Sequence, residues 1–380
     1  MMKSNSKTLG LYIHIPFCVK KCNYCDFLSF STEMGVKRQY CHALVKEMKS
    51  WKEKVSAYEV DTIFIGGGTP SVLPLETMDM VFQGIYDNFN IKKQSEFTIE
   101  CNPGTIDEEK LKLYKRAHVN RLSFGMQSTI EEELKCLGRI HTYDEFVESY
   151  HLARKVGFDN LNVDIMSAIP FQTIESYETT LNRVVQLQPE HISSYSLIIE
   201  EGTPFYEKYK ETPPIDEDTD RKMYERTDEI LSKAGYERYE ISNYAKNGKE
   251  CKHNLKYWQR EEYLGVGLGS ASLLNHWRFS NERELQNYIK NVEKDDSTIV
   301  EREELTRQDE KSEFMYLGLR CMKGISRQRF FVCFGEQIDA CFGDAIAKGK
   351  EQGLLQEEGD WIRLTKKGID VSNWVFEMFI

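Results

Sequence analysis

The chain has 380 residues, of which 40% are hydrophobic and 29% charged, and its formal net charge at pH 7 is −11. This length predicts one large folded domain and a small one, and the acidic balance argues against a nucleic-acid partner, because binding to phosphate backbones requires clustered Lys and Arg. No segment approaches the roughly 18 apolar residues of a membrane span, and MMKSNSKTLG leads into a strand and not into a signal peptide, so we expect a cytoplasmic protein.

Short runs rich in β-branched and aromatic residues alternate with amphipathic segments along the first half of the chain. The amphipathic segments include 35–51 and 144–156, in which apolar residues recur at helical spacing. Six such units predict an α/β fold built as a partial (β/α)6 barrel. The predicted strands are 11–17, 62–68, 97–103, 121–127, 160–166 and 191–199.

Polar residues and glycines stand where five of these strands end. Three cysteines follow the first strand, GGGTP (66–70) follows the second, and the next three carry Glu100, Gln127 and Asp164. Any one of these could be a turn residue or a hydrogen-bonded core residue. Since the carboxyl ends of parallel strands meet at one rim, their coincidence there predicts a ligand site.

The charged segment 292–310 predicts a surface connection between two domains, which we place at 1–290 and 305–380. In the second domain, helical segments precede a β-hairpin formed by 353–358 and 360–365. This α+β arrangement is similar to a winged helix. The sparse Lys and Arg on its helices make DNA binding the poorer interpretation.

Cys18, Cys22 and Cys25 follow the first strand as Cys-x3-Cys-x2-Cys. A zinc site usually needs a second pair of ligands, which this segment lacks, and the irregular spacing of the other cysteines does not fit a disulfide framework. Three thiolates would hold a [4Fe-4S] cluster and leave its fourth iron open to another ligand. We interpret the remaining cysteines as packing residues: Cys41, Cys101, Cys136, Cys251, Cys321, Cys333 and Cys341.

The segment YIHIPFCVKKCNYCDF (12–27) resembles the cluster-binding motif of the radical S-adenosylmethionine (SAM) superfamily. The resemblance implies that SAM chelates the open iron through its amino and carboxylate groups, and that the reduced cluster can cleave SAM to a 5′-deoxyadenosyl radical. It also implies the SAM contacts, which fall in GGGTP, GMQS, LGRIH and at the strand ends. These residues are Tyr12, Gly67, Gly68, Thr69, Glu100, Gln127, Arg139 and Asp164, with Tyr24 and Ile198 expected to line the site.

The same motifs are similar to the coproporphyrinogen dehydrogenase-like group, which has two branches. The oxygen-independent coproporphyrinogen III dehydrogenases carry a fourth cysteine, where this chain has Phe27. They also carry an N-terminal arm of tens of residues before the barrel, whereas here we expect the first strand to start near residue 9. The HemW-type haem chaperones carry His-Asn-x-x-Tyr-Trp, and this chain has HNLKYW (253–258). The hexapeptide therefore favours the chaperone branch.

Without this resemblance, His253 would be interpreted as an ordinary core or solvent histidine. The resemblance implies that His253, Tyr257 and Trp258 contact haem, because imidazole is a common ligand of haem iron and aromatic rings pack on porphyrins. Two features depart from the family pattern. SAIPFQT (167–173) replaces a Gly-Leu-Pro-Gly-Gln-Thr type of loop, and Ala271 stands where a histidine is common, which removes one candidate haem ligand or proton donor.

We therefore expect a haem chaperone with a SAM-liganded cluster that transfers haem to an acceptor protein, such as a membrane-associated respiratory haem protein. An electron donor would reduce the cluster. The main alternative is radical SAM oxidative decarboxylation of coproporphyrinogen III in haem synthesis. A different radical SAM reaction, such as methyl transfer, and a non-catalytic adaptor have no positive sequence feature. The sequence leaves open whether SAM is cleaved or only bound.

Overall fold

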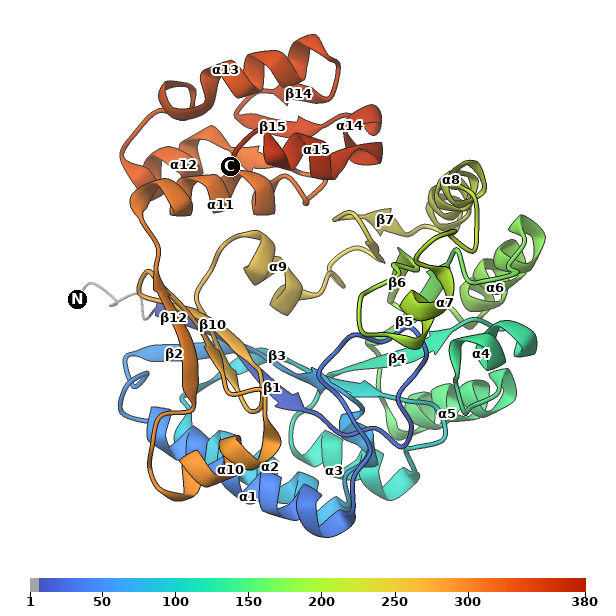
Figure 1. Cartoon of the computed structure of the whole chain (residues 1–380), viewed down its shortest axis with the longest axis vertical. Helices are drawn as coiled ribbons and strands as arrows, with labels where there is room; N and C mark the ends of the chain where they lie inside the picture. The colour runs from blue at the N-terminus through green and yellow to red at the C-terminus, as the bar shows by residue number, and fades with distance from the viewer. Residues whose placement is uncertain (1–6) are drawn as a thin grey trace.

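The computed structural model describes residues 7–380, so residues 1–6 of the first predicted domain lie outside the described residues. Its framework is a mixed sheet in which six parallel strands lie side by side in chain order (Figure 1). Within the described residues this sheet stays open, because β6 pairs with β5 and β8 and not with β1, and the predicted fold class is confirmed. The parallel strands are β1 (Lys7–Ile15), β2 (Tyr58–Gly67), β3 (Ile91–Cys101), β4 (Arg121–Gln127), β5 (Leu161–Ser167) and β6 (His191–Ser196), and β8 is Asn243–Ala245.

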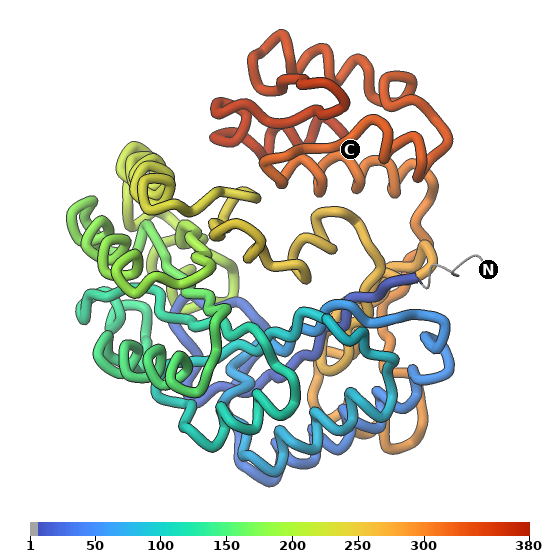
Figure 2. Tube along the Cα trace, turned by 180° about the vertical axis from the view of Figure 1, so that it is seen from behind, coloured from blue at the N-terminus to red at the C-terminus, as the bar shows by residue number. Residues whose placement is uncertain are grey.

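Helices connect the parallel strands and cover one face of the sheet. In α1 (Met34–Trp51), Tyr40, Leu44 and Met48 recur at helical spacing and are buried, as their pattern predicts. Both ribbon views place α1 on the opposite side of the sheet from α9 (Lys252–Trp258) (Figures 1 and 2). The other connecting helices are η1 (Pro70–Val72), α2 (Leu75–Asn88), α3 (Glu108–Arg116), α4 (Glu131–Leu137), α5 (Tyr143–Val156) and α6 (Ile174–Leu187). Two further helices, α7 (Pro204–Tyr209) and α8 (Glu217–Lys233), follow β6.

Residues 237–304 add further short strands, which the alternation of strand and helix segments along the sequence did not predict. The segment 292–310, expected to be a surface connection, instead contains β12 (Ile299–Glu304), which pairs with β11 (Trp277–Asn281) at the edge of the sheet. An edge strand needs main-chain hydrogen bonds on one side only, so its charged side chains can face water. The remaining elements here are β7 (Glu237–Arg238), β9 (Tyr263–Val266), β10 (Ala271–Leu274) and α10 (Leu285–Glu293).

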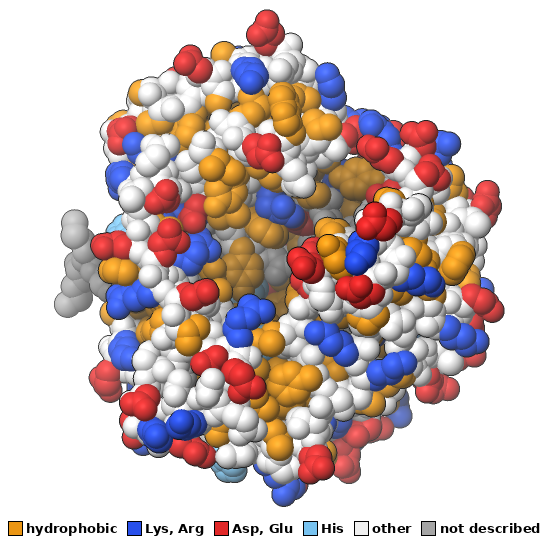
Figure 3. Space-filling model, in the orientation of Figure 1, with side chains coloured by type: hydrophobic (Ala, Val, Ile, Leu, Met, Phe, Trp, Pro, Cys, Tyr) orange, Lys and Arg blue, Asp and Glu red, His pale blue; other side chains and the backbone are white. Residues whose placement is uncertain are grey.

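The C-terminal elements surround a small antiparallel sheet and have their own core, which extends from Phe314 to Phe379. The predicted hairpin is present as β14 (Leu355–Glu358) and β15 (Trp361–Leu364). Figure 3 shows the molecule hollowed next to these elements, with hydrophobic and basic side chains in the hollow. The other elements are α11 (Arg307–Gly318), β13 (Ile325–Ser326), α12 (Arg327–Phe334), α13 (Ile338–Glu351), α14 (Lys366–Asp370) and α15 (Ser372–Glu377).

The larger hydrophobic core lies between the sheet and its helices and extends from Leu9 to Val292. The domain bounds of 1–290 and 305–380 stay a prediction. Among the helices of residues 7–380, none is long and apolar enough to cross a membrane.

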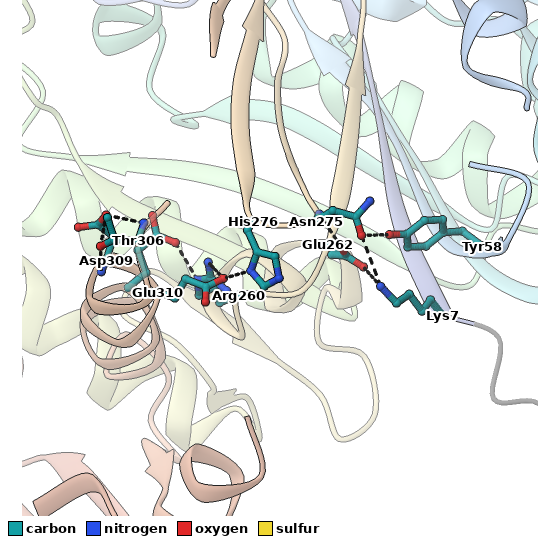
Figure 4. A network of polar contacts seen from close by, with 10 residues as sticks. Lys7, Tyr58, Arg260, Glu262, Asn275, His276, Thr306, Asp309 and Glu310 are labelled. Carbon is teal, nitrogen blue, oxygen red and sulfur yellow. Dashed lines mark hydrogen bonds and ion pairs between the residues drawn. The ribbon is translucent and has the colours of Figure 1, made fainter. Parts of the chain in front are cut away.

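Buried ion pairs attach α11 to the sheet. Arg260, just after α9, donates to Glu310 at 3.0 Å and to Glu313 at 2.8 Å, and Arg278 of β11 donates to Glu313 at 2.6 Å. Figure 4 shows Arg260 and His276 both directed at Glu310. A buried carboxylate is costly without its cationic partner, so these pairs fix how the C-terminal elements lie against α9.

A second buried carboxylate holds α1 against the later strands. Glu47 accepts hydrogen bonds from the Gly267 amide at 2.8 Å and from the side chains of Asn281 and Tyr288, both at 2.6 Å. The Thr298 hydroxyl donates to it at 3.3 Å. Burial raises the pKa of the Glu47 carboxyl, and these four donors oppose that rise. The network joins segments that are far apart in the sequence, so its loss should affect the whole fold.

We predict that Glu47→Ala lowers the free energy of unfolding by about 3 kcal/mol, because several buried donors lose their acceptor. Urea denaturation followed by circular dichroism measures this change. Glu53→Ala, at an exposed position after the same helix, is the control and should leave stability nearly unchanged. Equal stability of the two variants would contradict the structural role of the network.

Candidate functional site

The three cysteines lie on a loop that follows β1 and returns beside it. The Cys18 amide donates to the Phe30 carbonyl at 3.0 Å, and the Phe30 amide donates to the Pro16 carbonyl at 2.9 Å, so both ends of the loop are tied together. In its middle, Asn23 donates from its main chain and its side chain to carbonyls at the end of α4, both at 2.9 Å. The loop therefore has one defined conformation over the carboxyl ends of the strands.

Each thiol has a polar neighbour from this loop or another element. The Thr69 hydroxyl lies 3.6 Å from the Cys18 sulfur, and an Arg139 guanidinium nitrogen lies 3.6 Å from the Cys22 sulfur. Cys25 faces the Ser29 hydroxyl at 4.0 Å, and burial raises the pKa of its thiol. Donors of this kind stabilise sulfur that carries negative charge, as in a metal-bound thiolate.

The donor set suits an iron–sulfur cluster better than a single metal ion. Among residues 7–380, no three Cys, His, Asp or Glu side chains are close enough together to hold one ion. Zinc requires four ligands around one centre, whereas each thiolate of a cluster binds a different iron. Cys18, Cys22 and Cys25 line one cavity of about 470 Å³ and could supply three such ligands.

GGGTP brings the end of β2 against the cysteine loop. The Gly68 amide donates to the Ile15 carbonyl at 2.9 Å, and the Thr69 amide donates to the Phe17 carbonyl at 2.8 Å. A Cβ atom on Gly68 would lie only 2.8 Å from the Phe17 carbonyl oxygen, and Gly67 has φ +110°, which favours glycine. These glycines let the two main chains meet and leave Thr69 beside the first cysteine.

Two half-buried carboxyl groups, Glu100 on β3 and Asp164 on β5, line the same cavity. Glu100 accepts a hydrogen bond from the Gly67 amide at 3.0 Å, and Asp164 accepts one from Asn162 at 2.7 Å. Burial, with a smaller effect of Asp164, raises the pKa of Glu100 to about 8. Burial also raises the pKa of Asp164. The pair can accept hydrogen bonds from hydroxyl or amino groups of a ligand.

Arg139 connects the cysteine loop to the strands. Besides Cys22, its guanidinium donates to the Gly125 carbonyl and to the Asn102 side chain, and its Nε has no partner among the described residues. Asn102 also donates to the Thr69 hydroxyl at 2.7 Å. The sequence reasoning missed Asn102, although it directly follows β3 and the strand-end pattern that indicated Glu100 applies to it equally.

The other predicted SAM-site residues fall into two groups. Gln127, Tyr24 and Ile198 line the cavity, where the Gln127 side chain accepts a hydrogen bond from Tyr195 at 2.7 Å and Ile198 is 67% exposed. Tyr12 does not line it; its hydroxyl donates to His14 at 3.0 Å, beneath the cavity. Tyr12 supports the site through this hydrogen bond, and its contact with SAM stays a prediction.

HNLKYW forms most of α9, which packs against the middle of β2 and β3, where it contacts Thr62 and Glu96. The two ring nitrogens of His253 lie 2.9 Å from the Thr62 hydroxyl and 2.8 Å from the Tyr257 hydroxyl. The His253 amide donates to the buried Glu96 carboxylate at 3.0 Å. Burial lowers the pKa of His253 to about 3, so its ring is neutral at physiological pH. Both ring nitrogens already have a partner, so ligation of an iron by His253 would require one of these hydrogen bonds to break.

The helix presents different residues to different surroundings. His253 is 1% exposed and stacks on Phe64, with 5.4 Å between the ring centroids. Asn254 lines the cysteine cavity, whereas Trp258 lines a separate cavity beside the C-terminal elements. The sequence did not indicate a role for Asn254, because its orientation depends on where the helix docks.

Two family descriptions match this chain. Residues 12–184 match the radical SAM superfamily, and residues 305–371 match the HemN C-terminal domain. The first match contains the cysteine loop and most of the cavity described above.

Curated relatives match the chain over nearly its full length. Heme chaperone HemW of Bacillus subtilis is 36% identical, with 97% of this chain and 98% of the relative covered, and that of Escherichia coli is 34% identical, with 98% of each covered. A Danio rerio protein, radical S-adenosyl methionine domain-containing protein 1, mitochondrial, is 31% identical, with 94% of this chain and 84% of the relative covered.

A solved structure shares the fold. The coproporphyrinogen III oxidase HemN of Escherichia coli superposes with a TM-score of 0.88 at 23% identity, and 98% of this chain and 90% of that chain are covered.

We predict that Cys22→Ala prevents assembly of a stable cluster, because it removes one of three thiolate ligands. Anaerobic reconstitution with iron and sulfide, followed by the brown absorbance of the cluster, measures this. Cys333→Ala, at an exposed position in the C-terminal elements, should retain the absorbance. A fully loaded Cys22→Ala protein would contradict the assignment.

A pH effect should follow from the raised pKa of Glu100. The folded apoprotein keeps this proton up to a pKa of about 8, whereas the unfolded chain loses it near 4.5, so the carboxyl lowers the unfolding free energy progressively as pH rises between these values. Glu100→Gln removes this contribution. Its stability relative to wild type, from urea denaturation of cluster-free protein, should therefore increase from pH 5 to pH 8. A stability difference independent of pH would contradict the shift.

Proposed function

Since this chain belongs to the HemW heme chaperone family, we propose that it binds haem and passes it to an acceptor protein. The observation that carries this proposal is the similarity to curated heme chaperones over 97% or more of the chain. We further propose that it acts in the cytoplasm, and that its acceptor is a haem protein, such as one associated with the respiratory membrane. An electron donor would reduce the cluster.

The cavity at the strand ends fits the cofactors of the radical SAM superfamily. Cys18, Cys22 and Cys25 would hold a [4Fe-4S] cluster, with Thr69 and Arg139 stabilising charge on the sulfurs. When bound together, the cluster and SAM supply the chemistry of reductive cleavage of SAM. The protein's own contribution is to bind and orient the ligand between the carboxyl ends of β1 to β5.

The polar lining of the cavity supports SAM binding by the predicted residues. Glu100 and Asp164 offer acceptors to hydroxyl and amino groups, and Gln127 offers a donor and an acceptor. The glycines of GGGTP allow close approach of the main chain, and Tyr24 and Ile198 add apolar surface. Tyr12 supports the cavity through its hydrogen bond to His14.

We propose that α9 contributes to haem binding. Trp258 gives this proposal its structural support, because its indole borders a cavity. His253 and Tyr257 hydrogen-bond each other inside the fold and hold the helix in place. Direct contact of His253 and Tyr257 with haem stays a prediction.

Coproporphyrinogen III decarboxylation is the less well supported function. The similarity to HemN, at 23% identity, carries the fold only, whereas the relatives of Bacillus subtilis and Escherichia coli, at 36% and 34% identity, are named heme chaperones. Phe27, which stands where the dehydrogenases carry a fourth cysteine, lines the cavity and is 64% exposed.

We predict saturable haem binding by the wild-type protein, measured by anaerobic titration with haemin and the shift of the Soret band. His253→Ala should weaken binding about tenfold, because α9 loses its anchor to Thr62 and Tyr257. His42→Ala, at an exposed position of α1 on the opposite side of the sheet from α9, is the matched control and should bind haem like wild type. If wild type shows no saturable binding, the chaperone function is wrong for this protein.

A further inference from the structure

A second cavity lies between α9 and the C-terminal elements, and the cysteine cavity does not include it. Its volume is about 400 Å³, which lies in the usual range of small-molecule sites, roughly 300–1,000 Å³. One wall consists of Tyr239 and Trp258, and the other of Phe314 and Trp361 with Lys323. We call this cavity the interdomain cleft.

The cleft has large aromatic walls, and one indole N–H in them has no hydrogen-bond partner among the described residues. Trp258 comes from α9 and Trp361 from β15, so the two indoles are contributed by opposite sides. The Trp258 indole Nε1 is buried and has no hydrogen-bond partner in residues 7–380. Indole rings bury large flat surfaces and pack well on planar ring systems, so this lining suits a flat, aromatic ligand.

The cleft is also locally basic within an acidic protein. Two cations, Lys323 and Arg329, line it together with one carboxylate, Glu250, although the chain as a whole carries a net charge of −11. Arg329 also lies 3.8 Å from the Glu261 carboxylate outside the lining, so Lys323 is the cation without an acidic partner among the described residues. The Lys323 ammonium lies 4.2 Å from the centre of the Trp361 ring, and no described carboxylate pairs with it. A ligand that carries carboxylates on a flat ring would match this charge distribution.

Contacts on both sides of the cleft hold it open in a defined shape. The Met322 amide donates to the Tyr239 carbonyl at 2.9 Å, and Arg329 donates to the Gln259 carbonyl at 2.8 Å. Arg260, the residue after Gln259, forms ion pairs with Glu310 and Glu313. A preformed cavity binds its ligand without a large cost of ordering.

The cysteine cavity is not free to hold haem as well. Its volume of about 470 Å³ is lined by the three cysteines and by the residues proposed to contact SAM. A haem carried together with a cluster and SAM therefore needs a site of its own. The helix α9 borders both places, with Asn254 at the cysteine cavity and Trp258 at the interdomain cleft.

We propose that the interdomain cleft is the haem site of this protein, with the porphyrin ring held between Trp258 and Trp361 and the propionates directed at Lys323 and Arg329. This inference rests on the proposed function. It assigns the C-terminal elements a direct part in holding the haem, and it separates that site from the cluster. In HNLKYW, the tryptophan then contacts haem, whereas His253 positions the helix.

The test is a haemin titration of the reconstituted full-length protein. The double variant Trp258→Ala/Trp361→Ala should bind haemin about tenfold more weakly than wild type, and Lys323→Glu about fivefold more weakly. Trp374→Ala and Lys366→Glu, at exposed C-terminal positions outside the cleft, are the matched controls and should bind like wild type. Cluster absorbance and the melting temperature show that each variant is folded.

Haemin dimethyl ester tests the part played by the carboxylates. Wild type should bind the ester more weakly than haemin, and Lys323→Glu should show a smaller difference between the two. Because Lys323 is an exposed side chain, its substitution tests the site even if the double tryptophan variant fails to fold.

The two proposals fail in different ways. Saturable binding by wild type with unchanged affinity in Lys323→Glu and in the folded tryptophan variant would overturn the cleft as the haem site and leave the chaperone function standing. Absence of saturable binding by wild type would overturn the chaperone function itself.

Discussion

The close approach of β2 to the cysteine loop is the constraint on which the site depends. The main-chain hydrogen bonds from Gly68 to Ile15 and from Thr69 to Phe17 join the loop to the sheet, and a side chain at Gly68 would collide with the Phe17 carbonyl. Together with the contacts of Asn23 at the end of α4, this contact fixes the loop over the strand ends. The cysteines thereby face the cavity that the other strands line.

Buried and half-buried polar groups extend this arrangement across the sheet. Arg139 contacts Cys22 and Asn102, and Asn102 contacts Thr69. These side chains link the cysteine loop, the end of β3 and GGGTP. On the other side, Asp164 accepts from Asn162, whose carbonyl accepts from His191. Thr69, Asn162 and His191 are buried and the other groups are half-buried, so their hydrogen bonds are shielded from water and the network resists local rearrangement. The cavity is therefore defined before any ligand enters it.

Hydrogen bonds shielded from water also hold α9 in place. His253 is anchored by Thr62 and Tyr257, and the main chain at the start of the helix is anchored by Glu96. From this fixed position the helix borders the cysteine cavity at one place and the interdomain cleft at another. Polar contacts also continue from His191 to Tyr239, and the Cys251 amide donates to the Tyr239 hydroxyl at 3.2 Å. The two cavities thus share structural supports, although they are separate.

The sequence by itself determined the parallel strands, the helices that cover them and the residues at the strand ends. These depend on the local spacing of apolar residues and on the order of the β–α units. Cys18, Glu100, Gln127 and Asp164 could be selected on that basis. Short strands such as β9 and the charged edge strand β12 could not, since pairing with distant partners defines them. Only the tertiary structure decided that His253 faces inward while Trp258 faces a cleft. The docking of α9 and the C-terminal elements, which no local pattern encodes, sets both orientations.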